Sequence, residues 1–230
     1  MNEVSVMSGG VSSSRRSARP GESMADRRET AIVSVIDDDH AVTDSLRILI
    51  ESVGREVATF NSATDFIEAY DAERPGCIVL DERMPGMSGH ALQEELVRRR
   101  ALIPVILITA HAEVEMAVDA MRLGAVTLIE KPFRDQKLLD AIDEALRRDA
   151  ESRERHRDRS SLEFRLASLT ARQREVMELV IRGMPNKAIA RDLGISERTV
   201  ELHRSRVLRG MEVGSAAELA FAVGRLRGET

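Results

Sequence analysis

The sequence predicts an α/β doubly wound (βα)5 domain followed by a small all-α helix-turn-helix domain. Three observations lead to this prediction. Between residues 31 and 146, short apolar runs alternate with amphipathic segments, which is typical of a parallel sheet covered on both faces. Several of these runs end on acidic, hydroxyl or basic residues. After residue 166, short helical segments alternate with glycine turns, and the longest of them is rich in arginine.

The length and composition fit two soluble domains. The chain has 230 residues, of which 43% are hydrophobic, and no apolar run reaches the roughly 18 residues needed to span a bilayer. The single Cys77 excludes an internal disulfide and suits the reducing cytoplasm, where it is expected as a small buried hydrophobe. Residues 1–30 lack the apolar stretch of a secretory signal, so we interpret them as a flexible leader in which Met24 is a second candidate start.

Five strand–helix pairs are expected in residues 31–146. Apolar side chains lie on one stripe of the first helix, which Gly54 ends, and an Asn61-Ser62 pair caps the second. The fourth strand ends at Thr109, and the third helix follows the loop 82–89 and ends near Arg100. The other predicted strands are 31–36, 57–60, 77–80 and 126–129, and the other predicted helices are 40–53, 62–70, 114–123 and 134–148.

Polar side chains follow four of these strands and are expected to meet at one edge of the sheet. Carboxyl ends of parallel strands form the ligand crevice of open α/β sheets. If the carboxylates of residues 37, 38 and 81 lie within about 5 Å, each like-charge pair costs roughly 3 kcal/mol at an effective dielectric near 20. Such a cluster requires either protonation or a cation, and oxygen-only ligands favour Mg²⁺. With Thr109 and Lys131 nearby, it is suited to form an acyl phosphate. The alternative is a solvated strand end.

Residues 147–165 mix arginine and glutamate and are expected to be a solvated helical linker that extends the last helix of the first domain. Apolar residues reappear toward the end of this linker and just after it as candidates for docking on the second domain, namely Leu162, Phe164, Leu166 and Leu169. Residues 166–230 carry the helix-turn-helix, with helices predicted at 171–182, 187–193, 197–211 and 216–226. Their predicted caps are Thr170 with Gln173, Asn186, Ser196, and Ser215 with Glu218.

The third helix of this second domain has two faces. Val200, Val207, Met211 and the aliphatic stem of Arg204 lie on the inner side. The outer stripe is suited to read bases in a DNA major groove, unless it is simply a solvated face. It consists of Arg198, Leu202, Ser205 and Arg209, flanked by Glu201 and Arg206. Lys187 and Arg204 are better placed for phosphates.

The two halves of the chain differ in charge, which indicates that they have different functions. Residues 31–146 carry 22 acidic and 11 basic side chains, whereas residues 147–230 carry 13 acidic and 18 basic ones, nearly all arginine. An acidic half tolerates a divalent cation, and a basic half suits a phosphate backbone.

Four motifs of the first domain resemble the receiver domain of two-component response regulators: Val-Ile-Asp-Asp-Asp (35–39), Leu-Asp-Glu-Arg-Met-Pro-Gly-Met-Ser-Gly (80–89), Ile-Thr-Ala-His (108–111) and Glu-Lys-Pro-Phe (130–133). The resemblance implies that Asp81 is phosphorylated by a sensor histidine kinase. It further implies Mg²⁺ bound by Asp38, Asp81 and the carbonyl of Arg83, with Asp37 acting through water. Thr109 and Lys131 would contact the phosphoryl oxygens, and the peptide bond before Pro132 would be cis.

The family pattern also implies a switch and a dimer face. Receiver domains usually have an aromatic residue three positions before the lysine, where this chain has Leu128. Val118, Arg122 and Thr127 occupy positions through which the family dimerises, although Thr127 stands where an acidic residue is frequent.

Three motifs of the second domain resemble the LuxR-type DNA-binding domain: Leu-Thr-Ala-Arg-Gln-Arg-Glu-Val (169–176), Gly-Met-Pro-Asn-Lys-Ala-Ile-Ala (183–190) and Ile-Ser-Glu-Arg-Thr-Val-Glu-Leu-His-Arg (195–204). Together the two halves resemble FixJ-like regulators. That resemblance implies a cytoplasmic, phosphorylation-activated transcription regulator that forms a homodimer when phosphorylated. Its expected partners are promoter DNA and the transcription machinery.

Two other functions are compatible with parts of the pattern. One is an enzyme that uses the same aspartate to transfer phosphate from a small molecule. However, Asp81-Glu82-Arg83 lacks the second aspartate, two positions on, that such phosphatases use as general acid. The other is a constitutive DNA-binding protein whose first domain only makes protein contacts. We therefore predict a regulator rather than an enzyme.

Overall fold

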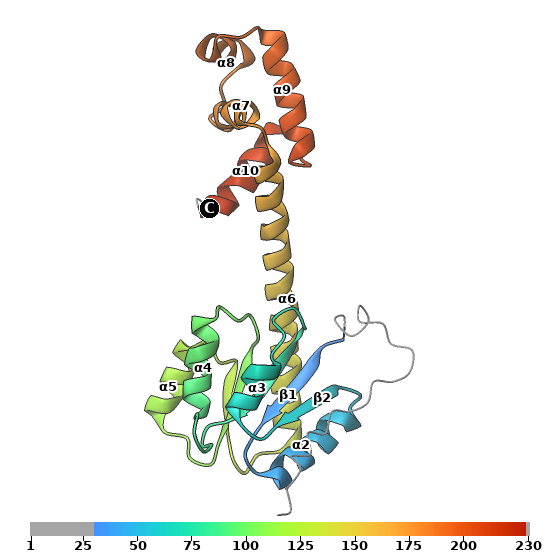
Figure 1. Cartoon of the computed structure of the whole chain (residues 1–230), viewed down its shortest axis with the longest axis vertical. Coiled ribbons are helices and arrows are strands. Elements are labelled where there is room, and N and C mark those ends of the chain that lie inside the picture. Colours follow the sequence, from blue (N-terminus) through green and yellow to red (C-terminus); the bar gives the residue numbers. More distant parts are fainter. Residues whose placement is uncertain (1–29, 229–230) are drawn as a thin grey trace, which may run out of the picture. The chain divides into compact units, whose positions relative to one another are not determined.

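The computed structural model describes residues 30–228, so the predicted leader lies almost wholly outside the described residues (Figure 1). The chain divides into two compact units, with the boundary between Leu146 and Arg147. Each unit has its own apolar core. None of the helices within residues 30–228 is long and apolar enough to cross a membrane.

The first unit contains the predicted sheet of five parallel strands, in the order β2-β1-β3-β4-β5. Because β1 lies between β2 and β3, the strand order reverses there, and the reversal opens a crevice at the carboxyl ends of β1 and β3. Every residue of β3 is buried, as expected for a central strand covered on both faces. The strands are β1 (Ile32–Ile36), β2 (Glu56–Phe60), β3 (Gly76–Asp81), β4 (Val105–Thr109) and β5 (Thr127–Glu130).

Helices cover the two faces of this sheet with separate cores. One core joins the sheet to α2 (His40–Ser52) and to the first part of α6 (Asp135–Ser168), through buried residues such as Ile50 and Leu138. The other core joins the sheet to α3, α4 and α5, through residues such as Phe66 and Leu92. These three helices are α3 (Ala63–Ala69), α4 (Gly89–Arg98) and α5 (Val114–Arg122).

Side-chain caps fix where the first helices begin. Asp39 caps α2 by accepting a hydrogen bond from the amide of Ala41, so the third aspartate of the Asp-Asp-Asp run has a structural role. Ser62 caps α3, as predicted, and Ser88 caps α4. By contrast, α5 has no side-chain cap and buries only Ala120, which makes it the least firmly packed of these helices.

The second unit contains the rest of α6 and four shorter helices around one apolar core. The connector is helical, as predicted, because α6 continues through it without a break. Thr170 and Gln173 form the predicted capping box at the start of α7. The four helices are α7 (Ala171–Ile181), α8 (Asn186–Leu193), α9 (Glu197–Gly210) and α10 (Ala216–Arg227).

Three local predictions in this unit are wrong. Asn186 does not cap α8: it is the first helical residue, the N-cap is Pro185, and the Asn186 side chain instead accepts a hydrogen bond from Arg204. Ser215 caps α10, as predicted, but the Glu218 carboxylate accepts the amide of Gly214 instead of that of Ser215, so the predicted capping box does not close. Phe164 does not dock, because its side chain is 77% exposed.

Replacing Gly76 with alanine is predicted to destabilise the first unit. A Cβ at this position would lie 2.1 Å from the carbonyl oxygen of Ile32 on the neighbouring strand β1. Overpacking against backbone should lower the free energy of unfolding by about 3 kcal/mol. Chemical denaturation of the variant measures this loss. Gly224→Ala in α10, where a Cβ meets nothing within 4 Å, is the matched control. Equal stability of the two variants would contradict this reading of the β1–β3 contact.

Candidate functional site

A lysine joins two buried carboxylates at the carboxyl edge of the sheet. The ammonium Nζ of Lys131 lies 3.0 Å from Oδ2 of Asp37 and 2.6 Å from Oδ1 of Asp81. These residues follow or end the strands β1, β3 and β5, so the contacts link three strands across 50 and 94 positions of sequence. The structure therefore brings together three of the predicted site residues.

Backbone amides hold the other oxygen of each carboxylate. Oδ1 of Asp37 accepts a hydrogen bond from the amide of Asp39 at 2.9 Å, and Oδ2 of Asp81 accepts one from the amide of Arg83 at 2.8 Å. Each carboxylate is thus fixed between its own loop and the ammonium of Lys131. Buried polar groups held from both sides cannot rotate away, so the site is preorganised.

Burial raises the pKa of Asp81, and the nearby charge of Asp37 raises it further, while the hydrogen bond from Lys131 lowers it in part. Burial acts against the charge of Lys131, but its hydrogen bonds to Asp81 and Asp37 raise the pKa of this lysine overall. Lys131 therefore stays protonated at neutral pH. The carboxylates carry more negative charge than one ammonium neutralises, which leaves the site attractive to a further cation.

The structure agrees only in part with the Mg²⁺ ligands that the sequence predicts. Within residues 30–228, no group of three acidic, histidine or cysteine side chains converges in a geometry that holds a metal ion. Asp37 is 4% exposed and faces Lys131, whereas Asp38 is exposed. Mg²⁺ commonly takes one or two carboxylates and completes its shell with water, so Asp37 and Asp81 are compatible with it.

Thr109 is almost fully buried, and its hydroxyl contacts its own turn. The Oγ1 atom donates to the carbonyl of His111 at 3.1 Å and accepts from the amide of His111 at 3.2 Å. The same loop is held from β5, where the Glu130 carboxylate accepts the amide of Ala112. Thr109 would have to break these contacts before it could bond to a phosphoryl oxygen.

The sequence prediction missed two residues beside Asp81. Burial raises the pKa of Glu82, whose Oε2 is a buried oxygen without a hydrogen-bond partner among residues 30–228. Gly89 is buried at the start of α4, and a Cβ there would lie 2.5 Å from the carbonyl oxygen of Asp81. Glycine at 89 thus lets α4 approach the backbone of the site, a close approach that motif spacing alone does not reveal.

The helix α5 exposes an apolar surface beside β5. Val114, Val118 and Met121 are 81%, 44% and 50% exposed, and Arg122 beside them pairs with Asp119 of its own helix. Thr127 is half-buried at the start of β5. Leu128, which stands at the position usually taken by an aromatic residue, packs against the core under α3, α4 and α5.

In the second unit, α9 has the two faces that its sequence predicts. Val200, Val207 and Met211 are at most 1% exposed and form its inner side. Arg204 is half-buried and donates to Asn186 of α8 at 3.3 Å. Lys187 is exposed in the first turn of α8. The outer residues of α9 are all exposed, namely Arg198, Glu201, Leu202, Ser205, Arg206 and Arg209.

Comparison with known proteins agrees with both halves of this description. Residues 33–143 match the family described as response regulator receiver domain, and residues 167–223 match the bacterial regulatory proteins of the luxR family. The chain is 46% identical over 191 residues to the transcriptional regulatory protein FixJ of Azorhizobium caulinodans, covering 83% of this chain and 90% of that protein. The chain belongs to the FixJ-like response regulators. It is accordingly a phosphorylation-dependent transcriptional regulator of the two-component type.

Other relatives support this assignment. Nodulation protein W of Bradyrhizobium diazoefficiens is 43% identical over 189 residues, covering 82% of this chain and 83% of that protein. Among solved structures, the response regulator StyR is 45% identical with a TM-score of 0.79, covering 85% of this chain and 99% of that chain. A receiver domain implies a histidine kinase partner and generally binds Mg²⁺ at the site of phosphorylation, and a LuxR-type domain implies DNA binding.

Mg²⁺ is predicted to stabilise this response regulator through the carboxylates that Lys131 joins. At about five times its Kd, the ion should add about 1 kcal/mol to the free energy of unfolding. Asp37→Asn should remove most of this gain, because it deletes one buried carboxylate. Asp44→Asn, an exposed residue that pairs with Arg47 on α2, should keep it. Calorimetry with and without Mg²⁺ measures the effect, and an equal gain in Asp37→Asn would exclude this site.

Proposed function

We propose that Asp81 is the phosphoacceptor of this regulator and that its phosphorylation controls DNA binding by α9. The observation that carries the proposal is the contact of Lys131 with both Asp37 and Asp81 at the β1–β3 crevice. A buried, preorganised carboxylate beside a fixed cation is suited to receive a phosphoryl group. The match to the receiver family supports the same assignment.

In the proposed reaction, a carboxylate oxygen of Asp81 attacks the phosphorus of a phosphohistidine on the kinase. The new O–P bond forms as the P–N bond breaks, and the released histidine nitrogen takes up a proton. Mg²⁺, bound by Asp38, Asp81 and the carbonyl of Arg83 with Asp37 acting through water, would neutralise charge on the transferred oxygens. Lys131 would move its contact from the Asp81 carboxylate to the phosphoryl group.

Phosphorylation would change the charge balance at the crevice. The phosphoryl group carries about −1.5 to −2 at neutral pH and three acceptor oxygens. We propose that Thr109 then turns from His111 toward one of these oxygens and releases the loop before α5. Because α5 has no side-chain cap and buries one residue, it is the helix that can shift at least cost. Leu128 would repack beneath it in place of the usual aromatic ring.

We propose that the shifted α5–β5 surface pairs two copies of the chain. Val118, Arg122 and Thr127 lie on it, and Val114 and Met121 add exposed apolar area. Pairing would place two α9 helices against two half-sites of a promoter. Arg198, Glu201, Leu202, Ser205, Arg206 and Arg209 would face the bases, and Lys187 would contact phosphates.

The chemistry at Asp81 is proposed as an input switch rather than as turnover of a small molecule. The relatives of the chain are transcription regulators, and the second unit provides an exposed arginine-bearing helix as output. The transcription machinery and the histidine kinase are therefore the protein partners that we propose.

Asp81→Asn is predicted to abolish the response to phosphorylation. With a small-molecule phosphodonor and Mg²⁺, the wild-type chain should gain phosphate, form dimers and bind a selected DNA site more tightly. Asp81→Asn should show none of these changes, while the exposed Asp44→Asn control should show all of them. Phosphate content, light scattering and DNA affinity measure the three responses. A full response in Asp81→Asn would overturn the proposal.

Arg198→Ala is predicted to weaken sequence-specific DNA binding by about 1–3 kcal/mol, because one base contact is lost. Lys187→Ala should instead weaken binding to all sequences and reduce the salt dependence of log K by about one unit. Arg159→Ala is the control, since this exposed arginine pairs with Glu163 on α6. Titration of selected and random duplexes at several salt concentrations separates these effects. Uniform loss in Arg198→Ala would contradict a base contact.

A further inference from the structure

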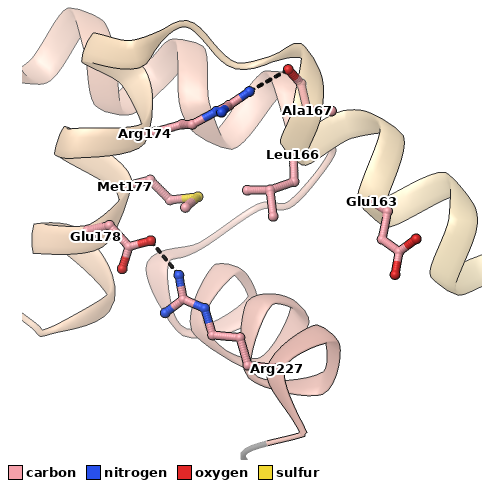
Figure 2. A pocket seen from close by; sticks show the side chains of 7 residues that line it. All are labelled: Glu163, Leu166, Ala167, Arg174, Met177, Glu178 and Arg227. Atoms are coloured by element: carbon pink, nitrogen blue, oxygen red, sulfur yellow. Dashed lines mark hydrogen bonds and ion pairs between the residues drawn. The ribbon is translucent and has the colours of Figure 1, made fainter.

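The last turns of α6 are built into the core of the second unit. Leu162 and Leu166 pack against the apolar cluster that contains Val200 of α9 and Met211 at its end. Leu169 is itself a member of that cluster. Figure 2 shows Leu166 beside Met177 in a pocket between α6, α7 and α10. The end of α6 is therefore part of the DNA-binding unit and not a free tether.

Arg174 of α7 fixes the carboxyl end of α6. Its guanidinium donates to the carbonyl of Ala167 at 2.7 Å, a contact that Figure 2 also shows. The last carbonyls of a helix have no partner within the helix, and a cation at that end is favourable. The α6 end is thus held from α7 by a contact independent of its leucines.

A second contact joins α6 to the carboxyl end of α9. Arg165 donates to the carbonyl of Met211, the C-cap of α9, at 3.3 Å, and pairs with the carboxylate of Glu212 at 2.9 Å. The same guanidinium bonds to Ser161 on the preceding turn of α6. Arg165 is half-buried, so its position is fixed on both sides.

The backbone at this end of α9 needs such support. Glu212 has a φ of 55°, a left-handed conformation that non-glycine residues adopt at a cost. At Gly210, a Cβ would lie 3.2 Å from Cδ2 of Leu169, which shows how closely the segment after α6 approaches α9. Arg165 therefore stabilises the conformation in which α9 ends, and the leucines keep α6 in place beside it.

We propose that Arg165 is a positioning residue for DNA reading, which fastens the end of α6 to the end of α9 so that the orientation of α9 follows α6. The inference rests on the proposed role of α9 in base contacts. The side chain of Arg165 contacts both α6 and the end of α9. It thereby links the connector helix directly to the helix that would read the bases.

The test compares full-length Arg165→Met, which keeps an aliphatic stem, with the control Arg159→Met, whose arginine pairs with Glu163 on the next turn of α6. Binding to a selected duplex should weaken about tenfold in Arg165→Met, equivalent to one base contact. Binding to a random duplex should stay within about twofold, because the guanidinium of Arg165 is already paired with the Glu212 carboxylate and bonded to the carbonyl of Met211. Arg165→Lys, which keeps the cation, should recover part of the discrimination.

A second measurement needs no DNA. Hydrogen exchange of residues 205–213 should be faster in Arg165→Met and in Glu212→Gln, and unchanged in Arg159→Met. Glu212 is 67% exposed on its side chain, so its substitution tests the contact in a chain that folds. Unchanged exchange, or equal losses on selected and random duplexes, would overturn the positioning role. If the wild-type chain prefers no sequence, the proposed function fails, whereas the exchange rates still decide whether Arg165 anchors α9.

Discussion

The ammonium of Lys131 holds two buried carboxylates from neighbouring strands, and the geometry of the first unit depends on this contact. Without that cation, Asp37 and Asp81 would be neighbouring like charges at buried positions, and breaking a buried pair typically costs about 3–5 kcal/mol. The parallel sheet makes the meeting possible because its carboxyl ends share one edge. One ammonium does not balance the negative charge of the crevice, so a divalent cation can still be accommodated there, and the two cations together can offset the charge of a phosphoryl group.

The segments that follow the crevice residue Thr109 in the first unit are weakly held. The Thr109 hydroxyl bonds to its own turn, and the next helix, α5, has no side-chain cap and buries one residue, Ala120. Low local stability is a property of elements that move in switches. In the second unit the opposite holds, because leucines of α6, a capping box on α7 and the contacts of Arg165 hold the recognition helix firmly.

Much of this could be predicted from the sequence, and the failures have physical causes. Apolar runs, their polar ends and helix punctuation are local signals, so the strands, most helices and the meeting of Asp81 with Lys131 followed from them. Asn186 was misassigned because Pro185 takes the N-cap position and leaves the asparagine to bond Arg204. The roles of Gly89 and Arg165 depend on distances between elements, which no spacing in one sequence encodes.

The central claim is that Asp81 itself receives the phosphoryl group. An acyl phosphate is reduced by borohydride to an alcohol, which converts a phosphorylated aspartate into homoserine. Full-length protein treated with a phosphodonor and Mg²⁺, reduced and mapped by peptide mass spectrometry, should contain homoserine at position 81 and aspartate at positions 37 and 38. Homoserine at another position, or an unmodified residue 81 in protein that has taken up phosphate, would contradict the account.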